Sequence, residues 1–261
     1  MRQCREEFNA MSIITELKIK HNLKKRRKVV HKSVCDSTNE EAKRRSDLPD
    51  GTLFIADRQT AGKGRMGRRW ESEARSGIYM SLLLKPKLSD DCSSQITLIA
   101  GMAVARALGN GAMIKWPNDV VIGSRKVCGI LTEMSHGALI CGIGINVNTP
   151  SFPDELKDRA TSLYIETNKT FNIEKVVADV INEFEPLYRK FIVYGFAPLC
   201  DEYKKMCVTL GKTVSVIQNN SKIRCTAEDI SPNGGLIVKT DTGTLCVTSG
   251  EVSVRGIYGY V

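Results

Sequence analysis

The stretch Gly62-Lys-Gly-Arg-Met-Gly-Arg-Arg-Trp70 decides which fold this chain can have, because it holds three glycines and four cations within nine positions. Glycines at this density let the backbone turn with positive φ and approach a ligand closely, and cationic side chains attract anions. The stretch therefore predicts a loop that wraps a phosphorylated or carboxylated ligand.

The same letters satisfy the Gly-x-Gly-x-x-Gly pattern, but their context excludes a dinucleotide-binding fold. In that fold the third glycine opens a helix with an apolar face. Here Gly67 is followed by Arg-Arg-Trp-Glu-Ser-Glu-Ala-Arg, which has no apolar face. The chain also lacks the His-Arg-Asp and Asp-Phe-Gly motifs of a protein kinase. Side chains and loop amides must therefore bind the anion.

A Walker A loop is excluded as well. Gly211-Lys-Thr213 has the end of that motif, but Met206 stands where the motif requires its first glycine.

The composition bounds the class of protein. The 261 residues are 42% hydrophobic and 26% charged, as in a globular protein with one sizeable domain and a small one. No run reaches the roughly 18 apolar residues of a membrane span, and no secretion signal begins the chain. We therefore expect a soluble, cytoplasmic protein that does not enter a membrane. Nine cysteines without a Cys-x-x-Cys pair, and only three histidines, predict free buried thiols with no disulfide and no bound zinc.

The net charge of +9 is concentrated at the N-terminus. Residues 1–32 hold ten Lys and Arg against three Glu, a balance of +7. We interpret residues 1–28 as a basic leader that is solvated and partly disordered. A basic run such as Lys24 to Lys28 can also bind the phosphates of a nucleic acid. About 28 residues are too few for a winged helix-turn-helix, which argues against sequence-specific DNA binding.

Residues 29–208 read as one domain in which apolar strands and helices alternate. Asp36-Ser-Thr-Asn39 supplies capping residues ahead of a short helix from Glu40, and the same junction can present hydroxyls to a polar ligand. A helix begins after Asn172, and Pro186 is expected to kink it. We expect the other helix at 94–108, a long loop at 148–170, and strands at 29–35, 53–57, 78–84, 113–116, 120–122, 127–134 and 138–147.

Polar residues at the ends of these strands are expected to meet on one rim of a mixed sheet, where clefts usually form. They are Lys115, Asn118, Asp119, Lys126 and Asn146.

The pattern of apolar and polar residues changes near Val208. Short alternating runs separated by Asn219-Asn220, Asn233-Gly-Gly235 and Asp241-Thr-Gly243 predict a small antiparallel barrel. We therefore divide the chain into a leader at 1–28, a catalytic domain at 29–208 and a C-terminal domain at 209–261.

Taken together, six motifs resemble those of the biotin protein ligase family, in the family's order, from Val34 to the end of the chain. They are Asp36-Ser-Thr-Asn39, Gln59 to Trp70, Lys115-Trp-Pro-Asn-Asp119, Lys126 to Glu133, Gly142 to Asn148 and Ala160-Thr-Ser-Leu163, followed by a terminal Gly250 to Arg255. The resemblance implies an α+β fold. Its catalytic domain would be a mixed β-sheet flanked by helices, like class II aminoacyl-tRNA synthetases, followed by an SH3-like β-barrel. It is closest to the form of the family that lacks an N-terminal DNA-binding domain.

The resemblance also implies a reaction in two steps. Biotin and MgATP give biotinyl-5′-AMP and pyrophosphate, and the biotinyl group then passes to a lysine. That lysine belongs to the biotin carboxyl carrier protein domain of a biotin-dependent carboxylase such as acetyl-CoA carboxylase. The sequence does not identify the acceptor, and it leaves a homodimer open.

Site residues follow from the resemblance, motif by motif. The biotin site would comprise Ser37, Thr38, Asn39, Gln59, Gly62, Lys63, Gly64, Arg65, Lys126 and Gly129. The ATP site would comprise Arg65, Arg68, Trp70, Lys115, Asn118, Lys126 and Asn146. The only metal implied is the Mg²⁺ that accompanies ATP, with no metal site in the protein itself.

The residue types suit this chemistry. Biotin's carboxylate is already ionised at neutral pH, so the first step needs cations rather than a base. Arg65, Lys115 and Lys126 would stabilise the charge that gathers as pyrophosphate departs. The second step needs a base, because a lysine amine has a reference pKa of about 10.4. Asp119 is the candidate base, although a turn-capping role explains it equally well.

One residue departs from the family and two other functions stay open. Lys63 stands where many members carry arginine, which predicts weaker biotin binding. A lipoyl or octanoyl transferase shares the fold but not the arginine-rich loop followed by Lys-Trp-Pro-Asn-Asp. A biotin-responsive nucleic-acid binder would use residues 18–32 instead.

Overall fold

A mixed seven-stranded sheet in the order β1-β2-β3-β7-β6-β5-β4 forms the centre of the computed structural model, which describes residues 15–72, 76–87, 92–218, 221–248 and 253–256. Strands β1 and β2 run parallel, and every other neighbouring pair is antiparallel. The mixed sheet expected from the sequence is therefore confirmed. Its strands are β1 (Val29–Cys35), β2 (Thr52–Gln59), β3 (Gly77–Leu84), β4 (Met113–Lys115), β5 (Asp119–Ile122), β6 (Arg125–Ser135) and β7 (Ala138–Asn146).

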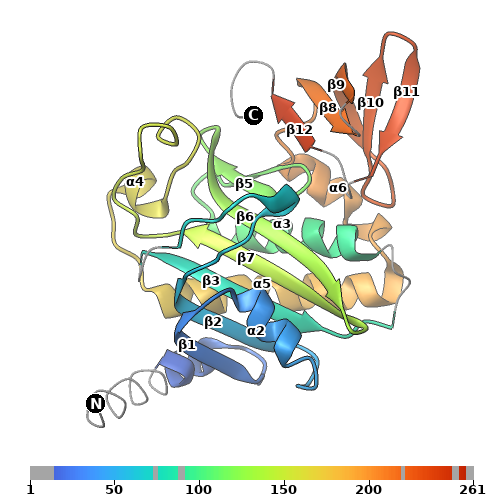
Figure 1. Cartoon of the computed structure of the whole chain (residues 1–261). Helices are drawn as coiled ribbons and strands as arrows, with labels where there is room; N and C mark the ends of the chain where they lie inside the picture. Colours follow the sequence, from blue (N-terminus) through green and yellow to red (C-terminus); the bar gives the residue numbers. More distant parts are fainter. Residues whose placement is uncertain (1–14, 73–75, 88–91, 219–220, 249–252, 257–261) are drawn as a thin grey trace.

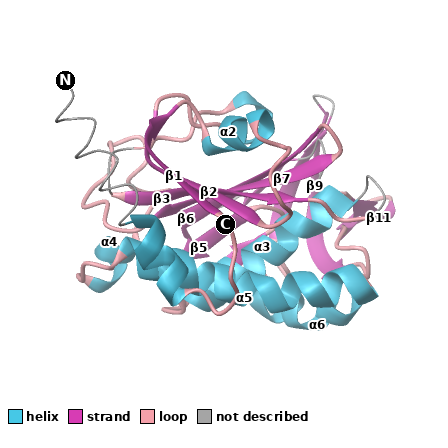
Figure 2. Cartoon of the chain, turned by 90° about the horizontal axis from the view of Figure 1, so that it is seen from below, coloured by secondary structure: helices cyan, strands magenta, loops and turns pink. Residues whose placement is uncertain are grey.

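Helices cover the two faces of this sheet unequally, as Figure 2 shows. The short helix α2 (Thr38–Arg44) lies on one face, and α3 (Cys92–Leu108), α5 (Ile173–Tyr194) and α6 (Ala197–Met206) lie on the other. The main hydrophobic core fills the space between the sheet and the three longer helices, and a smaller cluster lies under α2. The α2 face is therefore the thinly covered one, which leaves room for a ligand.

The alternation of side chains along β7 explains how one strand serves both faces. Cys141, Ile143 and Ile145 belong to the main core, whereas Ile140 belongs to the cluster under α2. Because successive side chains of a strand point to opposite faces, Gly142 and Gly144 fall on the same side as Ile140. The α2 face thus loses its side chains toward the end of β7.

Three α-helical segments among the described residues are not expected from the sequence: residues 15–22, α4 (Leu163–Thr167) and α6. The five-residue α4 lies within the predicted loop at 148–170, and its N-cap Ser162 accepts a hydrogen bond from Ile165 N. Helix α6 follows α5 after a turn at Gly195, which has a φ of 71°. Pro186 does not end α5, which continues to Tyr194.

From residue 15 onward the N-terminal segment packs against α5 and the main core, which differs from the expectation of a solvated, partly disordered leader. Residues 15–22 are helical, and Ile19 is fully buried in the main core. Lys24 N donates to Asn182 Oδ1 at 2.9 Å, and Lys25 and Arg27 both form ion pairs with Glu185 of α5. Two cations of the basic run are therefore committed within the fold. Residues 1–14 lie outside the described residues.

The C-terminal sheet is antiparallel with the strand order β11-β10-β9-β8-β12 (Figure 1). It packs beside Trp116, which lies between β4 and β5 and is fully buried, and the Trp116 indole N–H donates to Gly234 O at 3.0 Å. Trp116 N also donates to Thr209 Oγ1 at 2.9 Å. Its strands are β8 (Thr213–Gln218), β9 (Ser221–Ile230), β10 (Leu236–Thr240), β11 (Gly243–Val247) and β12 (Ser253–Gly256).

Two further expectations can be compared with the described residues. The seven cysteines recorded there are all free, and Cys246 alone among them is exposed. Within the described part of the chain, no helix has the length and apolarity needed to cross a membrane. Residues 250–252 of the terminal Gly250 to Arg255 motif lie outside it.

We predict that Ile19→Ala lowers the free energy of unfolding by about 2–4 kcal/mol, because it leaves a cavity in the core. Leu17→Ala on the same helix should cost less than about 0.5 kcal/mol, because Leu17 is 59% exposed. Urea denaturation of both variants measures the difference. Equal stability of the two variants would mean that the N-terminal helix does not belong to the folded unit.

Candidate functional site

A pocket lies on the α2 face of the sheet, between the start of α2, the glycine-rich loop, and strands β6 and β7. Its floor has no side chains of its own, because it is formed by Gly129 of β6 and by Gly142 and Gly144 of β7. Gly129 and Gly144 are direct partners in the antiparallel register. Three glycines on one face of two adjacent strands therefore hollow out the sheet.

Neighbouring side chains occupy the space that these glycines leave. A Cβ added at Gly144 would lie 2.6 Å from Trp70 Cε2, and one at Gly129 would lie 2.8 Å from Trp70 Cζ3. A Cβ at Gly142 would overlap Asn39 Oδ1. Trp70 and Asn39 thus approach the backbone of the floor too closely for any larger residue. The Trp70 indole N–H is buried and has no hydrogen-bond partner among the described residues.

The glycine-rich loop folds as a tight hairpin whose two sides bond to each other. Gly64 N donates to Arg68 O at 2.7 Å, and Trp70 N donates to Gly62 O at 3.0 Å. At the tip, Met66 and Gly67 adopt positive φ angles of 57° and 71°, and glycine suits this conformation at little cost. The hairpin carries Arg65 and Trp70 to the pocket and leaves Arg68 exposed.

The cations beside the pocket are held by polar partners. Arg65 Nη1 donates to Asn118 Oδ1 at 3.0 Å, and Lys126 Nζ lies 2.6 Å from Asp119 Oδ1. Lys126 Nζ also lies 5.3 Å from the centre of the Trp70 ring, within the range of a cation–π contact. Burial lowers the pKa of the Arg65 guanidinium, which nevertheless stays cationic at neutral pH because its usual value is so high.

The loop expected at 148–170 supports Lys126 from outside the pocket. Lys126 N donates to Arg159 O at 2.8 Å, and Thr161 N donates to Lys126 O at 2.8 Å. Asn146 Nδ2 in turn donates to Thr161 O at 3.0 Å. Lys126 pairs with β5 on one side of β6, and these bonds hold its backbone on the other side. Asn146 helps to hold the loop that makes them.

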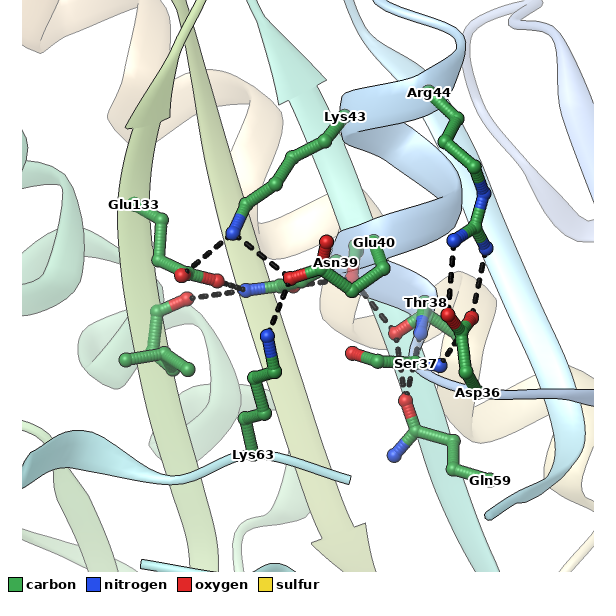
Figure 3. A network of polar contacts seen from close by, with 12 residues as sticks. Asp36, Ser37, Thr38, Asn39, Glu40, Lys43, Arg44, Gln59, Lys63 and Glu133 are labelled. Atoms are coloured by element: carbon green, nitrogen blue, oxygen red, sulfur yellow. Dashed lines mark hydrogen bonds and ion pairs between the residues drawn. The ribbon is translucent and has the colours of Figure 1, made fainter. Parts of the chain in front are cut away.

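A network of hydrogen bonds and ion pairs surrounds the start of α2 (Figure 3). Gln59 Oε1 accepts from Thr38 N at 2.8 Å, and Asn39 Nδ2 donates to Glu133 Oε2 at 2.7 Å. Lys43 Nζ bridges Glu133 and Glu40, and Lys63 Nζ donates to Glu40 Oε1 at 2.7 Å. Thr38 and Asn39 are thereby held at the pocket by Gln59 of β2 and Glu133 of β6.

The same network depresses the pKa values of its outer carboxyl groups. Hydrogen bonds from Lys63 and Lys43 lower the pKa of Glu40. The Arg44 guanidinium, which donates to both oxygens of Asp36, lowers the pKa of that carboxyl group to about 2. Both carboxylates therefore stay charged at neutral pH, and Lys63 is directed toward Glu40.

The structure brings most of the predicted site residues together at this pocket. Its wall includes nine of the ten residues predicted for biotin and four of the seven predicted for ATP. The residues that stand outside the wall are Gly62, Arg68, Lys115, Asp119 and Asn146; those that line it are Ser37, Thr38, Asn39, Gln59, Lys63, Gly64, Arg65, Trp70, Asn118, Lys126 and Gly129.

Each residue outside the wall has a different position. Gly62 is buried against Trp70 O, and Arg68 is exposed. Lys115 is buried in β4, directly opposite Asp119 in the register. Asp119 contacts Lys126, and Asn146 contacts the supporting loop.

Sequence reasoning missed several residues that shape the pocket. Gly142, Gly144 and Glu133 stand in quoted motifs but were given no role, and Lys43 and Ser81 were not considered. The two glycines could have been found, because residues two apart on a strand share a face. Ser81 and Lys43 carry no comparable signal, since only the tertiary structure places them beside Asn39 and Glu133.

Comparison with known proteins places the chain in a family. Residues 30–149 match the model of the biotin/lipoate A/B protein ligase family, and residues 209–255 match that of the biotin protein ligase C-terminal domain. The chain is 36% identical over 239 residues to the bifunctional ligase/repressor BirA of Bacillus spizizenii, which covers 87% of this chain and 74% of that protein. The chain belongs to the biotin protein ligase family.

Other biotin protein ligases are also similar along most of their length. The biotin–acetyl-CoA-carboxylase ligase of Paracoccus denitrificans is 30% identical over 236 residues, which are 85% of this chain and 98% of that protein. The structure of the biotin protein ligase from Aquifex aeolicus in complex with biotin and ATP superimposes with a TM-score of 0.82. It is 36% identical, and the match covers 88% of this chain and all of that one. The family expected from the sequence motifs is therefore confirmed.

We predict that Gly144→Ala displaces the Trp70 indole, because the added methyl group would lie 2.6 Å from its ring. The variant should lose about 1–3 kcal/mol of stability and shift its tryptophan emission. Gly101→Ala is the matched control, since its added Cβ would come no closer than 3.6 Å to Ile114 and alanine favours the helix. Fluorescence and thermal denaturation of both variants test this, and an unchanged emission spectrum of folded Gly144→Ala would contradict it.

Proposed function

We propose that this chain is an ATP-dependent biotin ligase that forms biotinyl-5′-AMP and transfers the biotinyl group to a lysine of a carrier domain. The observation that carries the proposal is the polarity of the pocket. One end, where Asn39 lies against Gly142, offers uncharged hydrogen-bonding groups from Thr38 and Gln59. The other end, where Lys126 lies against Gly129, offers the cations Arg65 and Lys126. A ligand with a neutral polar ring and a carboxylate tail, such as biotin, matches both ends.

The first step would take place at the cationic end. Attack of the biotin carboxylate on the α-phosphate concentrates negative charge, which Arg65 and Lys126 would stabilise. Both side chains are already oriented, by Asn118 and by Asp119 respectively. Such preorganised charges need little rearrangement as the transition state forms. Lys115 and the exposed Arg68 are proposed to add positive charge near the pyrophosphate.

Magnesium would enter this site together with ATP. The described residues contain no group of three or more His, Cys, Asp or Glu side chains that could hold a metal ion. Magnesium typically keeps several waters and binds substrate phosphates with few protein ligands, which suits such a site. It would neutralise charge on the phosphates.

The adenine and the adenylate would lie beside Trp70. Its ring is half-buried on the glycine floor and its N–H has no partner in the part of the chain that the structure describes, so it can offer both an aromatic surface and a donor. The hairpin that carries Trp70 would also limit the access of water to the mixed anhydride.

The second step would use Asp119 as the base that accepts a proton from the acceptor lysine. Its carboxylate already lies beside the cationic end, within 2.6 Å of Lys126 Nζ. The acceptor would be a biotin carrier domain of a carboxylase, the class named for the Paracoccus denitrificans relative.

The proposal also covers the domains and the cellular location of the protein. We assign residues 29–208 to a catalytic domain of the class II synthetase type and residues 209–261 to an SH3-like barrel, with the protein acting in the cytoplasm. The match of residues 209–255 to a separate family model supports this boundary.

We predict that the protein catalyses biotin-dependent exchange of labelled pyrophosphate into ATP. Exchange reports the reversible first step alone, so it requires no acceptor. Omitting biotin should abolish the signal. Folded protein that shows no exchange at saturating biotin and MgATP would reject the proposed activity.

We predict that Asp119→Asn separates the two steps. Transfer to a carrier lysine should slow by about 10²-fold or more, because a positioned base is lost. Adenylate formation should fall by less than about 10-fold, because both cations remain. Single-turnover assays of pyrophosphate release and of carrier labelling measure the two rates, and an equal loss in both would remove Asp119 from the base role.

A further inference from the structure

Beneath the uncharged end of the pocket, four side chains form a continuous line of short hydrogen bonds. Glu133 Oε2 accepts from Asn39 Nδ2 at 2.7 Å. Asn39 Oδ1 lies 2.6 Å from Ser81 Oγ, and Ser81 Oγ lies 2.7 Å from Thr38 Oγ1. Ser81 is fully buried, so water cannot replace these contacts. The line ends at Thr38, which lines the pocket.

The direction of each hydrogen bond follows from Glu133. Asn39 presents its amide nitrogen to the Glu133 carboxylate and to Leu131 O, two groups that can only accept. Its carbonyl oxygen must therefore face Ser81, and the serine proton lies between the two oxygens. A second short contact then remains between Ser81 and Thr38. Because the serine hydroxyl has a single proton, Thr38 must supply the proton for that contact.

Thr38 Oγ1 consequently offers lone pairs to the pocket rather than a proton. Gln59 Oε1, 3.2 Å away, is the other acceptor within its reach, but the single hydroxyl proton of Thr38 is already used in the shorter contact with Ser81 at 2.7 Å. A ligand atom opposite Thr38 is therefore favoured when it is an N–H donor.

We propose that Glu133 is a positioning residue for ligand selection: through Asn39 and Ser81 it holds the Thr38 hydroxyl as an acceptor for a ureido N–H. This inference rests on the proposed function, because it takes the ring of biotin to lie at this end. Glu133 itself stays outside the pocket wall.

Lys43 makes the effect of removing the charge predictable. Lys43 Nζ donates to Glu133 Oε1 at 2.7 Å and has no acceptor of its own. In Glu133→Gln the amide oxygen is drawn toward Lys43, so the new NH₂ group faces Asn39. Asn39 then turns over at the expense of its longer, 3.3 Å contact with Leu131 O, which reverses the line of protons and leaves Thr38 to donate.

The test measures biotin affinity by calorimetry in wild type, Glu133→Gln and Glu185→Gln. Glu133→Gln should weaken biotin binding by about 10-fold or more, the scale of a lost oriented hydrogen bond. Glu185→Gln is the matched control, because Glu185 is likewise an ion-paired glutamate, bonded to Lys25, Arg27 and Arg189, but lies on α5 away from the pocket. It should keep the wild-type affinity.

A rescue variant distinguishes positioning from a general structural role. In Glu133→Gln/Lys43→Met the amide oxygen is free to face Asn39 again, so biotin affinity should return to within about 3-fold of wild type. If Glu133→Gln weakened binding only by disturbing the structure, removal of Lys43 as well would lower the biotin affinity further. Biotin methylated at each ureido nitrogen in turn provides a ligand-side check. The analogue that lacks the recognised N–H should bind wild type and Glu133→Gln almost equally.

Wild-type affinity in folded Glu133→Gln, or no recovery in the double variant, would overturn the inference. Should Glu133→Gln fail to fold, Ser81→Ala replaces it, since cutting the line with Glu133 intact should give the same loss for biotin and little for the methylated analogue. Pyrophosphate exchange by wild type is measured in parallel, so that failure of the ligase activity itself is recognised separately.

Discussion

The close approach of Trp70 and Asn39 to three glycines on one face of the sheet is the constraint on which the rest of this structure depends. Gly129, Gly142 and Gly144 leave the α2 face bare, while the alternate residues of the same strands fill the core on the other face. Because the side-chain period of a strand is fixed at two, the sheet can be tightly packed on one side and hollow on the other. A single shift in register would put the glycines into the core and destroy both features.

Around this hollow, charged groups are held in place by partners on rigid elements. Lys126 is fixed by Asp119, by the Trp70 ring and by the backbone of Arg159 and Thr161. Such fixing costs side-chain entropy during folding rather than during binding, which favours fast chemistry over stability. The carboxylates near α2 play a corresponding part, because they direct amides and hydroxyls without entering the pocket.

The C-terminal sheet is connected to the same site through one motif. In Lys115-Trp-Pro-Asn-Asp119 the tryptophan donates to Gly234 of the C-terminal sheet, and the asparagine two residues later accepts from Arg65. A buried indole with a satisfied N–H is a strong anchor, since it combines a large apolar surface with a directional bond. The position of the cationic end therefore depends on how the two sheets pack.

The sequence by itself determined the family, the mixed sheet, the strands on either side of the pocket and most of its polar wall. Those features are local, because a glycine-rich loop, a strand period or a capped helix is written in neighbouring residues. It did not reveal that residues 15–28 pack on α5, that α6 forms, or that Ser81, Lys43 and Glu133 align behind Asn39. These depend on side chains from distant segments meeting at distances below 3 Å, as for Glu133 and Asn39 at 2.7 Å, and only the tertiary structure brings them together.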